Sequence, residues 1–327
     1  MKLAVRRFAA LIGIGISSAL VGCGQPPITA GKSVADAAQG LAIGGAVDKP
    51  GSISLAELKA LPSVTQTVQY GMGATRQTRT FTGADLWALL ESRGIKTEAA
   101  IRSDLLRKFV VATGSDGYRA AFSLAELRPD FGNRGSLVAY AEVKDGAPVV
   151  FGGAGVRVTA PGDMRGGRYV ASLARLDVHS SASTKTASGG GPSTRLDVSG
   201  AVLRPATFDL AALQALPATE RRIGKNVFRG VSLWDLLDTT AGLALDPKVK
   251  GDVLARYVVA TGSDGYQAVF ALGELDPAFG GQPNLVAYAM DGAALGSKGF
   301  ARLVVPNDVK AGRWVTNLVS VEVFAAP

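Results

Sequence analysis

The chain has almost none of the side chains that ligate soft metals or act as activated nucleophiles. Its 327 residues include one cysteine, Cys23, and one histidine, His179. Cys23 ends an N-terminal apolar run, and His179 stands at the edge of a stretch rich in Ser and Gly, where we expect it to be solvated. Ser-His-Asp and Cys-His catalysis and metal sites built on Cys or His are therefore excluded. We expect no catalytic residue and no metal ligand.

Long blocks of one charge sign are also missing. The 35 Lys and Arg residues outnumber the 27 Asp and Glu residues, for a formal net charge of +8, but three of the cations lie in the first seven residues. No basic run with interleaved aromatic residues, as is typical of nucleic-acid binding, is present. The mild excess favours anionic ligands, and we expect no nucleic-acid partner.

The N-terminus has the pattern of an export signal. Three cations, Lys2, Arg6 and Arg7, precede an apolar run over residues 8–20, which is shorter than the roughly 20 residues that a spanning helix needs. The run ends in the tetrapeptide LVGC, which is typical of the lipobox of bacterial lipoproteins. We predict that residues 1–22 are a signal peptide and that Cys23 is acylated.

Acylation of Cys23 would leave the mature chain without a thiol for a disulfide bond. We predict that residues 23–40 form a tether and that the exported protein is lipid-anchored to a membrane. Gly24, where Asp would favour retention at the inner membrane, indicates the outer membrane facing the periplasm if the host is Gram-negative.

The chain contains an internal repeat. The sequence VVATGSDGY occurs at residues 110–118 and again at 258–266, and LVAYA recurs at the same offset of 148 residues. We therefore predict two copies of one domain, over residues 41–178 and 195–327. Residues 179–194 between them are rich in Ser and Gly and predict a flexible linker.

The local patterns within each copy predict an α+β fold. Leucines at helical spacing predict short helices over residues 55–61 and 210–216, and residues 82–85 have the pattern of a capping box before the helix that carries Trp87. The VVATGSDGY segment predicts a strand, a tight turn and a second strand. Trp87 and its counterpart Trp234 stand among leucines and are expected in the core.

Two matching loops are the first candidate binding site. They share the pattern P-x-D-x-[RK]-x-G-R-[YW]-V, in which glycines permit close approach of the backbone and arginine offers a planar fork of donors. The alternative interpretation is a solvated turn in which the aspartate pairs with the neighbouring arginine. The candidate side chains are Asp163, Arg165, Arg168, Tyr169, Asp308, Lys310, Arg313 and Trp314.

Two hairpins and two strand arginines complete the candidate set. Each hairpin has hydroxyls on both sides of an Asp-Gly turn, which is also a strong turn signal by itself. Arg157 and Arg302 lie four residues before the loop proline on otherwise apolar strands, where a cation needs a partner. The hairpin residues are Ser115, Asp116, Tyr118, Ser263, Asp264 and Tyr266.

These motifs together resemble the oxidoreductase molybdopterin-binding domain, which has the sulfite-oxidase-like fold. The shared features are F-x-G-x-x-L-x-x-L-L, the D-G-Y hairpin, the L-V-A-Y strand and R-x-x-x-P-x-D-x-[RK]-x-G-R-[YW]-V, and both copies match over nearly their whole length. The resemblance implies that catalytic members ligate molybdenum through a cysteine thiolate and surround the pterin phosphate with a histidine and arginines. Neither copy here has a cysteine or a histidine.

The resemblance is nearest to short, exported members without cysteine, some of which are similar to periplasmic pterin-binding proteins that serve a membrane signalling partner. It implies a lipid-anchored protein that binds a pterin or related heteroaromatic ligand without catalysis. One alternative is an oxidoreductase that uses molybdopterin without a thiolate ligand. The other is an envelope scaffold that binds no small ligand.

Overall fold

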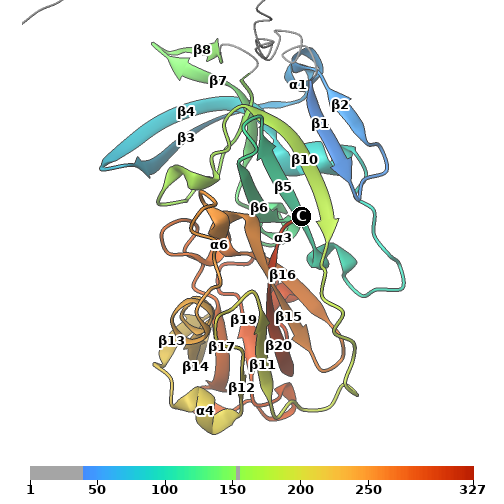
Figure 1. The fold of residues 1–327 in the computed structure, drawn as a ribbon, viewed down its shortest axis with the longest axis vertical. Coiled ribbons are helices and arrows are strands. Elements are labelled where there is room, and N and C mark those ends of the chain that lie inside the picture. Colours follow the sequence, from blue (N-terminus) through green and yellow to red (C-terminus); the bar gives the residue numbers. More distant parts are fainter. Residues whose placement is uncertain (1–39, 152–154) are drawn as a thin grey trace, which may run out of the picture. The chain divides into compact units, whose positions relative to one another are not determined.

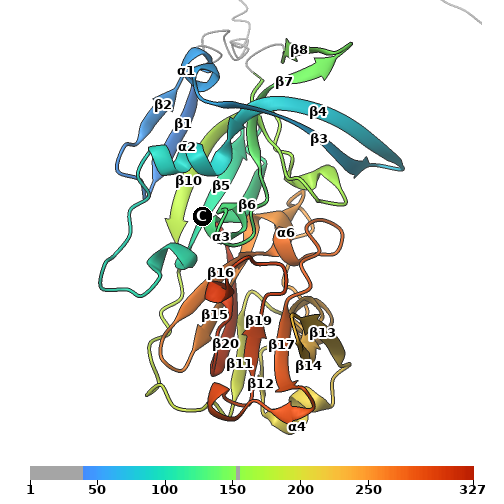
Figure 2. The same cartoon turned by 180° about the vertical axis from the view of Figure 1, so that it is seen from behind.

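The computed structural model describes residues 40–151 and 155–327 (Figures 1 and 2). The predicted signal peptide, Cys23 and nearly all of the predicted tether lie outside these residues. Within the described ranges, no helix is both long and apolar enough to cross a bilayer. The described residues belong to one compact unit, so the two copies of the repeat, hereafter the first and second repeats, pack against each other.

The first repeat is built around a five-stranded sheet in which the first and the last strand of the repeat lie side by side. The opening strand β1 runs parallel to the closing strand β10, whereas the other neighbours are antiparallel. In spatial order the strands are β2 (Gly51–Ile53), β1 (Leu41–Gly45), β10 (Leu173–Ser180), β5 (Lys108–Gly114) and β6 (Arg119–Ser123). The predicted hairpin over residues 110–118 is therefore confirmed as β5, turn and β6.

A second sheet of the first repeat packs over the same core. Its strands are β3 (Ser63–Met72), β4 (Thr75–Asp85), β7 (Leu137–Lys144) and β8 (Ala147–Val150), with β9 (Arg157–Val158) also paired to β7. The helical elements are α1 (Leu55–Ala60), α2 (Leu86–Ser92), α3 (Leu124–Leu127), η2 (Asp104–Arg107) and η3 (Gly166–Arg168).

The second repeat has the same two sheets in the same order. One contains β12 (Ala206–Phe208), β11 (Leu196–Gly200), β20 (Leu318–Ala325), β15 (Arg256–Gly262) and β16 (Gln267–Ala271). The other contains β13 (Thr219–Ile223), β14 (Asn226–Ser232), β17 (Leu285–Met290) and β18 (Ala293–Ala294), with β19 (Arg302–Val304) paired to β17. The two similar sheet pairs agree with the α+β class and with the sequence repeat.

Short helices connect the strands of the second repeat. They are α4 (Leu210–Gln214), α5 (Leu233–Asp235), α6 (Leu272–Leu275), the π-helical turn η4 (Leu236–Ala241) and the 3-10 turns η5 (Asp252–Ala255), η6 (Gly296–Lys298) and η7 (Ala311–Arg313). The predicted helices before the two Leu-Pro pairs are confirmed as α1 and α4. Trp234 on α5 is only partly buried, whereas Trp87 on α2 belongs to the core.

The predicted capping box over residues 82–85 is wrong, because the helix begins later than the pattern predicts. Thr82 lies within β4 and is paired with Thr65, whereas Asp85 is the N-cap residue of α2. The Asp85 carboxylate accepts a hydrogen bond from the backbone nitrogen of Ala88 at 2.8 Å, which satisfies one of the free N–H groups of the first turn. Strand β4 therefore continues to Asp85, three residues beyond the predicted cap residue Thr82.

The predicted linker makes several contacts with the second repeat. The backbone nitrogens of Ser188 and Gly190 both donate to the carbonyl of Ser263, at 2.7 and 3.1 Å, and the hydroxyl of Ser263 donates to the carbonyl of Gly191 at 2.6 Å. His179 lies within β10 rather than after it, and its ring stacks on Phe109 at 5.5 Å between centroids. Burial lowers the pKa of His179.

Candidate functional site

The two motif loops lie where the first repeat meets the second. The backbone nitrogen of Met164 in the first loop donates to the carbonyl of Phe279 in the second repeat at 3.0 Å, and that of Val309 in the second loop donates to the carbonyl of Phe131 in the first at 3.0 Å. Met164 and Val309 occupy the same place in the shared motif, and Phe131 and Phe279 are separated by the repeat offset. The contact between the repeats is therefore isologous, as in a twofold dimer.

The loop glycines permit this close approach. A Cβ atom on Gly167 would lie 2.6 Å from the ring of Phe279, and one on Gly312 would lie 2.5 Å from the ring of Phe131. Both distances are far below an ordinary carbon–carbon contact of about 3.5–4.0 Å. The sequence predicts that glycine lets the backbone approach a ligand, and in the structure the backbone approaches the other repeat.

Arg168 is wholly engaged inside this interface. Its guanidinium forms two hydrogen bonds with the Asp163 carboxylate, at 2.8 and 2.7 Å, and its third nitrogen donates to Glu126 at 2.6 Å. The side chain is 1% exposed. Burial acts to lower the pKa of Arg168, but the carboxylates of Asp163 and Glu126 outweigh it, so the pKa is raised overall and the group stays charged.

Arg313 repeats this arrangement in the second repeat. It forms two hydrogen bonds with Asp308, at 2.7 and 2.6 Å, and one with Glu274 at 2.5 Å. Its Nη1 also donates to the Ser123 hydroxyl of the first repeat at 3.3 Å. Each arginine forms two hydrogen bonds with an aspartate and a third with a glutamate. Bidentate, charge-assisted bonds of this kind are among the strongest that a guanidinium makes.

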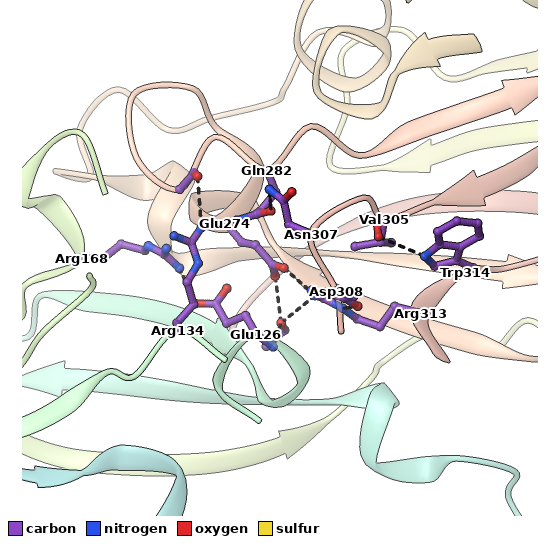
Figure 3. Close-up of polar contacts among 12 residues, drawn as sticks. Glu126, Arg134, Arg168, Glu274, Gln282, Val305, Asn307, Asp308, Arg313 and Trp314 are labelled. Atoms are coloured by element: carbon purple, nitrogen blue, oxygen red, sulfur yellow. Dashed lines mark hydrogen bonds and ion pairs between the residues drawn. The ribbon is translucent and has the colours of Figure 1, made fainter. Parts of the chain in front are cut away.

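Glu126 and Glu274 are interface residues that the sequence reasoning missed. They lie at matching places on α3 and α6, are almost fully buried, and stand between Arg168 and Arg313 (Figure 3). The signal is present in the sequence, because a glutamate falls at the same position of the apolar segments FSLAEL and FALGEL. A charged residue at a repeated position in an apolar run requires a buried partner.

The hairpin tyrosines hold the loops in place. The Tyr118 hydroxyl donates to the carbonyl of Gly167 at 2.8 Å, and the Tyr266 hydroxyl donates to the carbonyl of Gly312 at 2.5 Å. The hairpin aspartates serve their own turns, since Asp116 accepts from the backbone nitrogen of Tyr118 at 3.0 Å and Asp264 does the same for Tyr266. Ser115 is exposed, whereas Ser263 bonds to the linker.

The second cation of each loop lies at the rim of the interface. Lys310 forms an ion pair with Asp130 of the first repeat at 3.0 Å, and both side chains are exposed. Arg165 is exposed and its backbone pairs with Gly71 of β3. Exposed ion pairs of this kind contribute about 0–1 kcal/mol, so the buried arginines dominate the contact.

The loop aromatics differ between the repeats. The Tyr169 ring is stacked on Tyr70 of β3 with 4.2 Å between centroids, and the side chain is 7% exposed. Trp314 is only partly buried, its Nε1 donates to the carbonyl of Val305 at 3.0 Å, and its ring meets Phe228 edge-on. Strand β3 covers the loop of the first repeat, whereas the corresponding strand β13 is half as long.

Two candidate cations, Arg302 and Arg157, form no hydrogen bond or ion pair with the described residues. The guanidinium carbon of Arg302 lies 4.9 Å from the centre of the Trp314 ring. Its Nε is buried, and burial lowers the pKa of the group. The matching Arg157 of β9 lies over the rings of Phe81 and Phe151, at 5.4 and 5.1 Å.

The loop residues do not fit a molybdopterin group. The donors that the resemblance would direct at a pterin phosphate are the guanidinium nitrogens of Arg168 and Arg313, and every one of them already donates to a carboxylate. Among residues 40–151 and 155–327 no three carboxyl, imidazole or thiol groups cluster so as to hold a metal ion. The structure therefore gives no basis for a reaction step through that cofactor.

Comparison with known proteins gives a weak fold likeness. No family model matches the chain, and no curated protein matches it. Among solved structures it is similar to the sulfane dehydrogenase SoxCD from Paracoccus pantotrophus, at 14% identity and a TM-score of 0.35, over 70% of this chain and 58% of that one. The chain thus spans less than two thirds of the length of the structure that it matches.

Proposed function

We propose that the protein is a non-catalytic binding protein that takes a flat, anionic or acceptor-edged heterocycle, with a pterin as the candidate, at Arg302. The observation that carries the proposal is the half-buried guanidinium of Arg302, which rests on Trp314 without a partner among the described residues. The lipid anchor at Cys23 and a place in the bacterial envelope are parts of the proposal that rest on the sequence alone.

The physical argument is that a partly buried cation without a counterion is unfavourable until a partner arrives. The Trp314 ring lies within cation–π distance of the guanidinium and stabilises it there, so the fork of donors is held at this place before a ligand binds. The two terminal nitrogens make no bond to the described residues, and the residue as a whole is partly exposed. They would donate to a carboxylate, a phosphate or the oxygen edge of a ring.

The difference in cover between the repeats supports the second repeat as the main site. Tyr70 of β3 stacks on Tyr169, and the backbone nitrogen of Gly71 donates to the carbonyl of Met164 at 2.7 Å. Among the described residues, β13 forms neither an aromatic stack with Trp314 nor a backbone hydrogen bond with its loop, although Ile223 and Trp314 pack on the same apolar cluster. Arg157 with its two phenylalanine rings is proposed as the weaker counterpart in the first repeat.

The test is a titration of the full mature chain with pterin and with a pterin phosphate, followed by ligand fluorescence. A charge-assisted hydrogen bond contributes roughly 1.5–3 kcal/mol. Arg302→Ala should therefore weaken binding about 10- to 150-fold, and Arg302→Lys should restore it only in part because the fork is lost. The matched control is Arg229→Ala on neighbouring β14, which removes one exposed cation and should leave binding unchanged.

Absence of saturable binding by the wild type, or equal binding by folded Arg302→Ala, would contradict the proposal. Inorganic phosphate serves as a second ligand that separates anion capture from recognition of the ring. Stoichiometric molybdenum in the purified protein would instead favour the oxidoreductase alternative.

A scaffold without a small ligand is the second candidate. The observation that favours it is that the motif side chains Asp163, Arg168, Asp308 and Arg313 bond to groups of the protein itself. Persistence of the motif in both repeats then needs no ligand, because each copy stabilises the contact with the other. Failure of every titration above would leave this function.

A further inference from the structure

The centre of the interface contains more carboxyl groups than arginines. Among the described residues, three guanidinium groups face four carboxyl groups, so full ionisation would leave one uncompensated negative charge in a buried site. From the first repeat come Glu126, Asp163, Arg134 and Arg168, and from the second come Glu274, Asp308 and Arg313. A buried excess charge of this kind is removed by binding one proton.

The hydrogen bonds identify which carboxyl group holds the proton. Both oxygens of Glu274 accept hydrogen bonds, Oε1 from Arg313 at 2.5 Å and Oε2 from the Ser123 hydroxyl at 2.8 Å. In Glu126 only Oε1 accepts, from Arg168, while Oε2 is buried and accepts from no donor. The residue that would serve Oε2 by the repeat symmetry is Ala271, which has no hydroxyl.

We propose that Glu126 is protonated in the folded protein and donates through its Oε2 to Glu274, so that the two repeats are joined by a carboxyl pair which loosens when the proton leaves to solvent. The two side chains lie near each other between Arg168 and Arg313 (Figure 3), and each shifts the pKa of the other. No other reactant is involved, because the proton passes from Glu126 to water as the pH rises. Two carboxylates would then face each other across the interface and repel.

The pKa shifts of the two glutamates agree with this assignment. Burial raises the pKa of Glu126 to about 8, and Glu274 adds to the rise while Arg168 opposes it. Burial also acts to raise the pKa of Glu274, but Arg313 and the hydrogen bonds from Glu126 and Ser123 hold it below its ordinary value. The pair therefore keeps one proton at neutral pH.

The direction of the pH effect follows from these shifts. In the unfolded chain Glu126 loses its proton near its ordinary value of 4.5, whereas in the folded protein it keeps the proton to about pH 8. The stabilisation is fully present below the unfolded value and is lost as the pH rises through this window, with an unfolding equilibrium constant that increases at most about tenfold per pH unit. Glu274 contributes in the opposite sense, because its lowered pKa favours the folded state above 4.5.

The experiment measures amide hydrogen exchange in the full mature chain at pH 6, 7, 8 and 9, corrected for intrinsic rates. The reporters are the amides of Met164 and Val309, which donate across the interface. Between pH 6 and 8 their corrected exchange should rise by up to about 100-fold in the wild type. Glu126→Gln, whose amide still donates to Glu274 but does not titrate, should show a flat profile.

The matched control is Glu142→Gln, which removes a glutamate paired with Arg79 outside the interface and should keep the wild-type profile.

An infrared titration of the wild type follows the protonated carboxyl band and needs no variant. The band should persist at pH 7 and disappear by about pH 9. A band absent at pH 7, or a Glu126→Gln profile as steep as the wild type, would overturn the proposal. Neither readout involves Arg302 or a ligand.

Discussion

The two repeats are nearly equivalent where they meet each other and different where they face outward. At the interface Arg168 and Arg313, and Glu126 and Glu274, make matching bonds with similar lengths. Outside it, the β3–β4 hairpin is about twice as long as its counterpart and covers the first loop, whereas Trp314 in the second stays partly open. The comparison teaches that the repeated loop motif joins the two repeats, and that the ligand binding proposed above would depend on what each repeat adds or omits around that motif.

Removing one interface arginine should have the largest effect on stability. Arg313→Ala leaves Glu274 and Asp308 buried without their cation, and breaking a buried pair in this way destabilises by about 3–5 kcal/mol. Arg168→Ala should be similar, since the two sites match. Urea unfolding of the mature chain measures the free energy of unfolding for both.

The matched control is Arg175→Ala, which removes an arginine that pairs with Asp177 in an exposed position and should change stability by about 0–1 kcal/mol. If Arg313→Ala changes the free energy of unfolding no more than this control, the interface assignment is wrong. A large difference between Arg168→Ala and Arg313→Ala would contradict the equivalence of the two halves.

Adding one methyl group to a loop glycine should have an intermediate effect. In Gly312→Ala and Gly167→Ala the new Cβ would overlap a phenylalanine ring of the other repeat, and overpacking of this kind destabilises by roughly 1–3 kcal/mol. The control is the same substitution at Gly191, whose φ is likewise not positive and whose Cβ would meet nothing within 4 Å. Thermal unfolding compares the three variants, and equal losses would show that overlap with the phenylalanine ring is not responsible.

The sequence predicts the repeat, the α+β class and most element types because these follow from local patterns. The helices before Pro62 and Pro217 and the hairpin at residues 110–118 depend on neighbouring residues alone. The surface that each repeat turns toward the other depends on packing between distant segments, which no local pattern reports. The loop motif therefore singles out Arg168 and Arg313 as ligand contacts, whereas in the structure they bond to carboxylates of the protein, and their partners Glu126 and Glu274 are missed.

At the proposed ligand site, the sequence singles out Arg157 and Arg302, and these two arginines are not bonded to carboxylates of the described residues. A cation on an apolar strand needs a partner, and for Arg302 none is found among the described residues. What the sequence does not reveal is that β13 is half as long as β3, because strand length depends on pairing as well as on residue type. The assignment of a pterin to this place stays a prediction.

The smallest expected effect concerns one difference between the two halves of the interface. Ser123 donates to Glu274, but the second repeat has Ala271 at the matching place and leaves Oε2 of Glu126 without a donor. Ala271→Ser would supply a hydroxyl to this oxygen, stabilise the ionised form of Glu126 and so shift the loss of its proton to lower pH. One net hydrogen bond contributes about 0.5–1.5 kcal/mol, which corresponds to a shift of up to about one pH unit.

Ser123→Ala should act oppositely on Glu274 by removing its donor. It also removes the N-cap of α3, where the hydroxyl accepts from the backbone nitrogen of Glu126 at 3.1 Å. The infrared carboxyl titration compares the two variants, and the double variant exchanges the places of serine and alanine. If the hydroxyl decides which glutamate holds the proton, labelling each glutamate in turn should show the protonated carboxyl at Glu274 in the double variant, whereas an unchanged signal at Glu126 would mean that the rest of the interface sets the asymmetry.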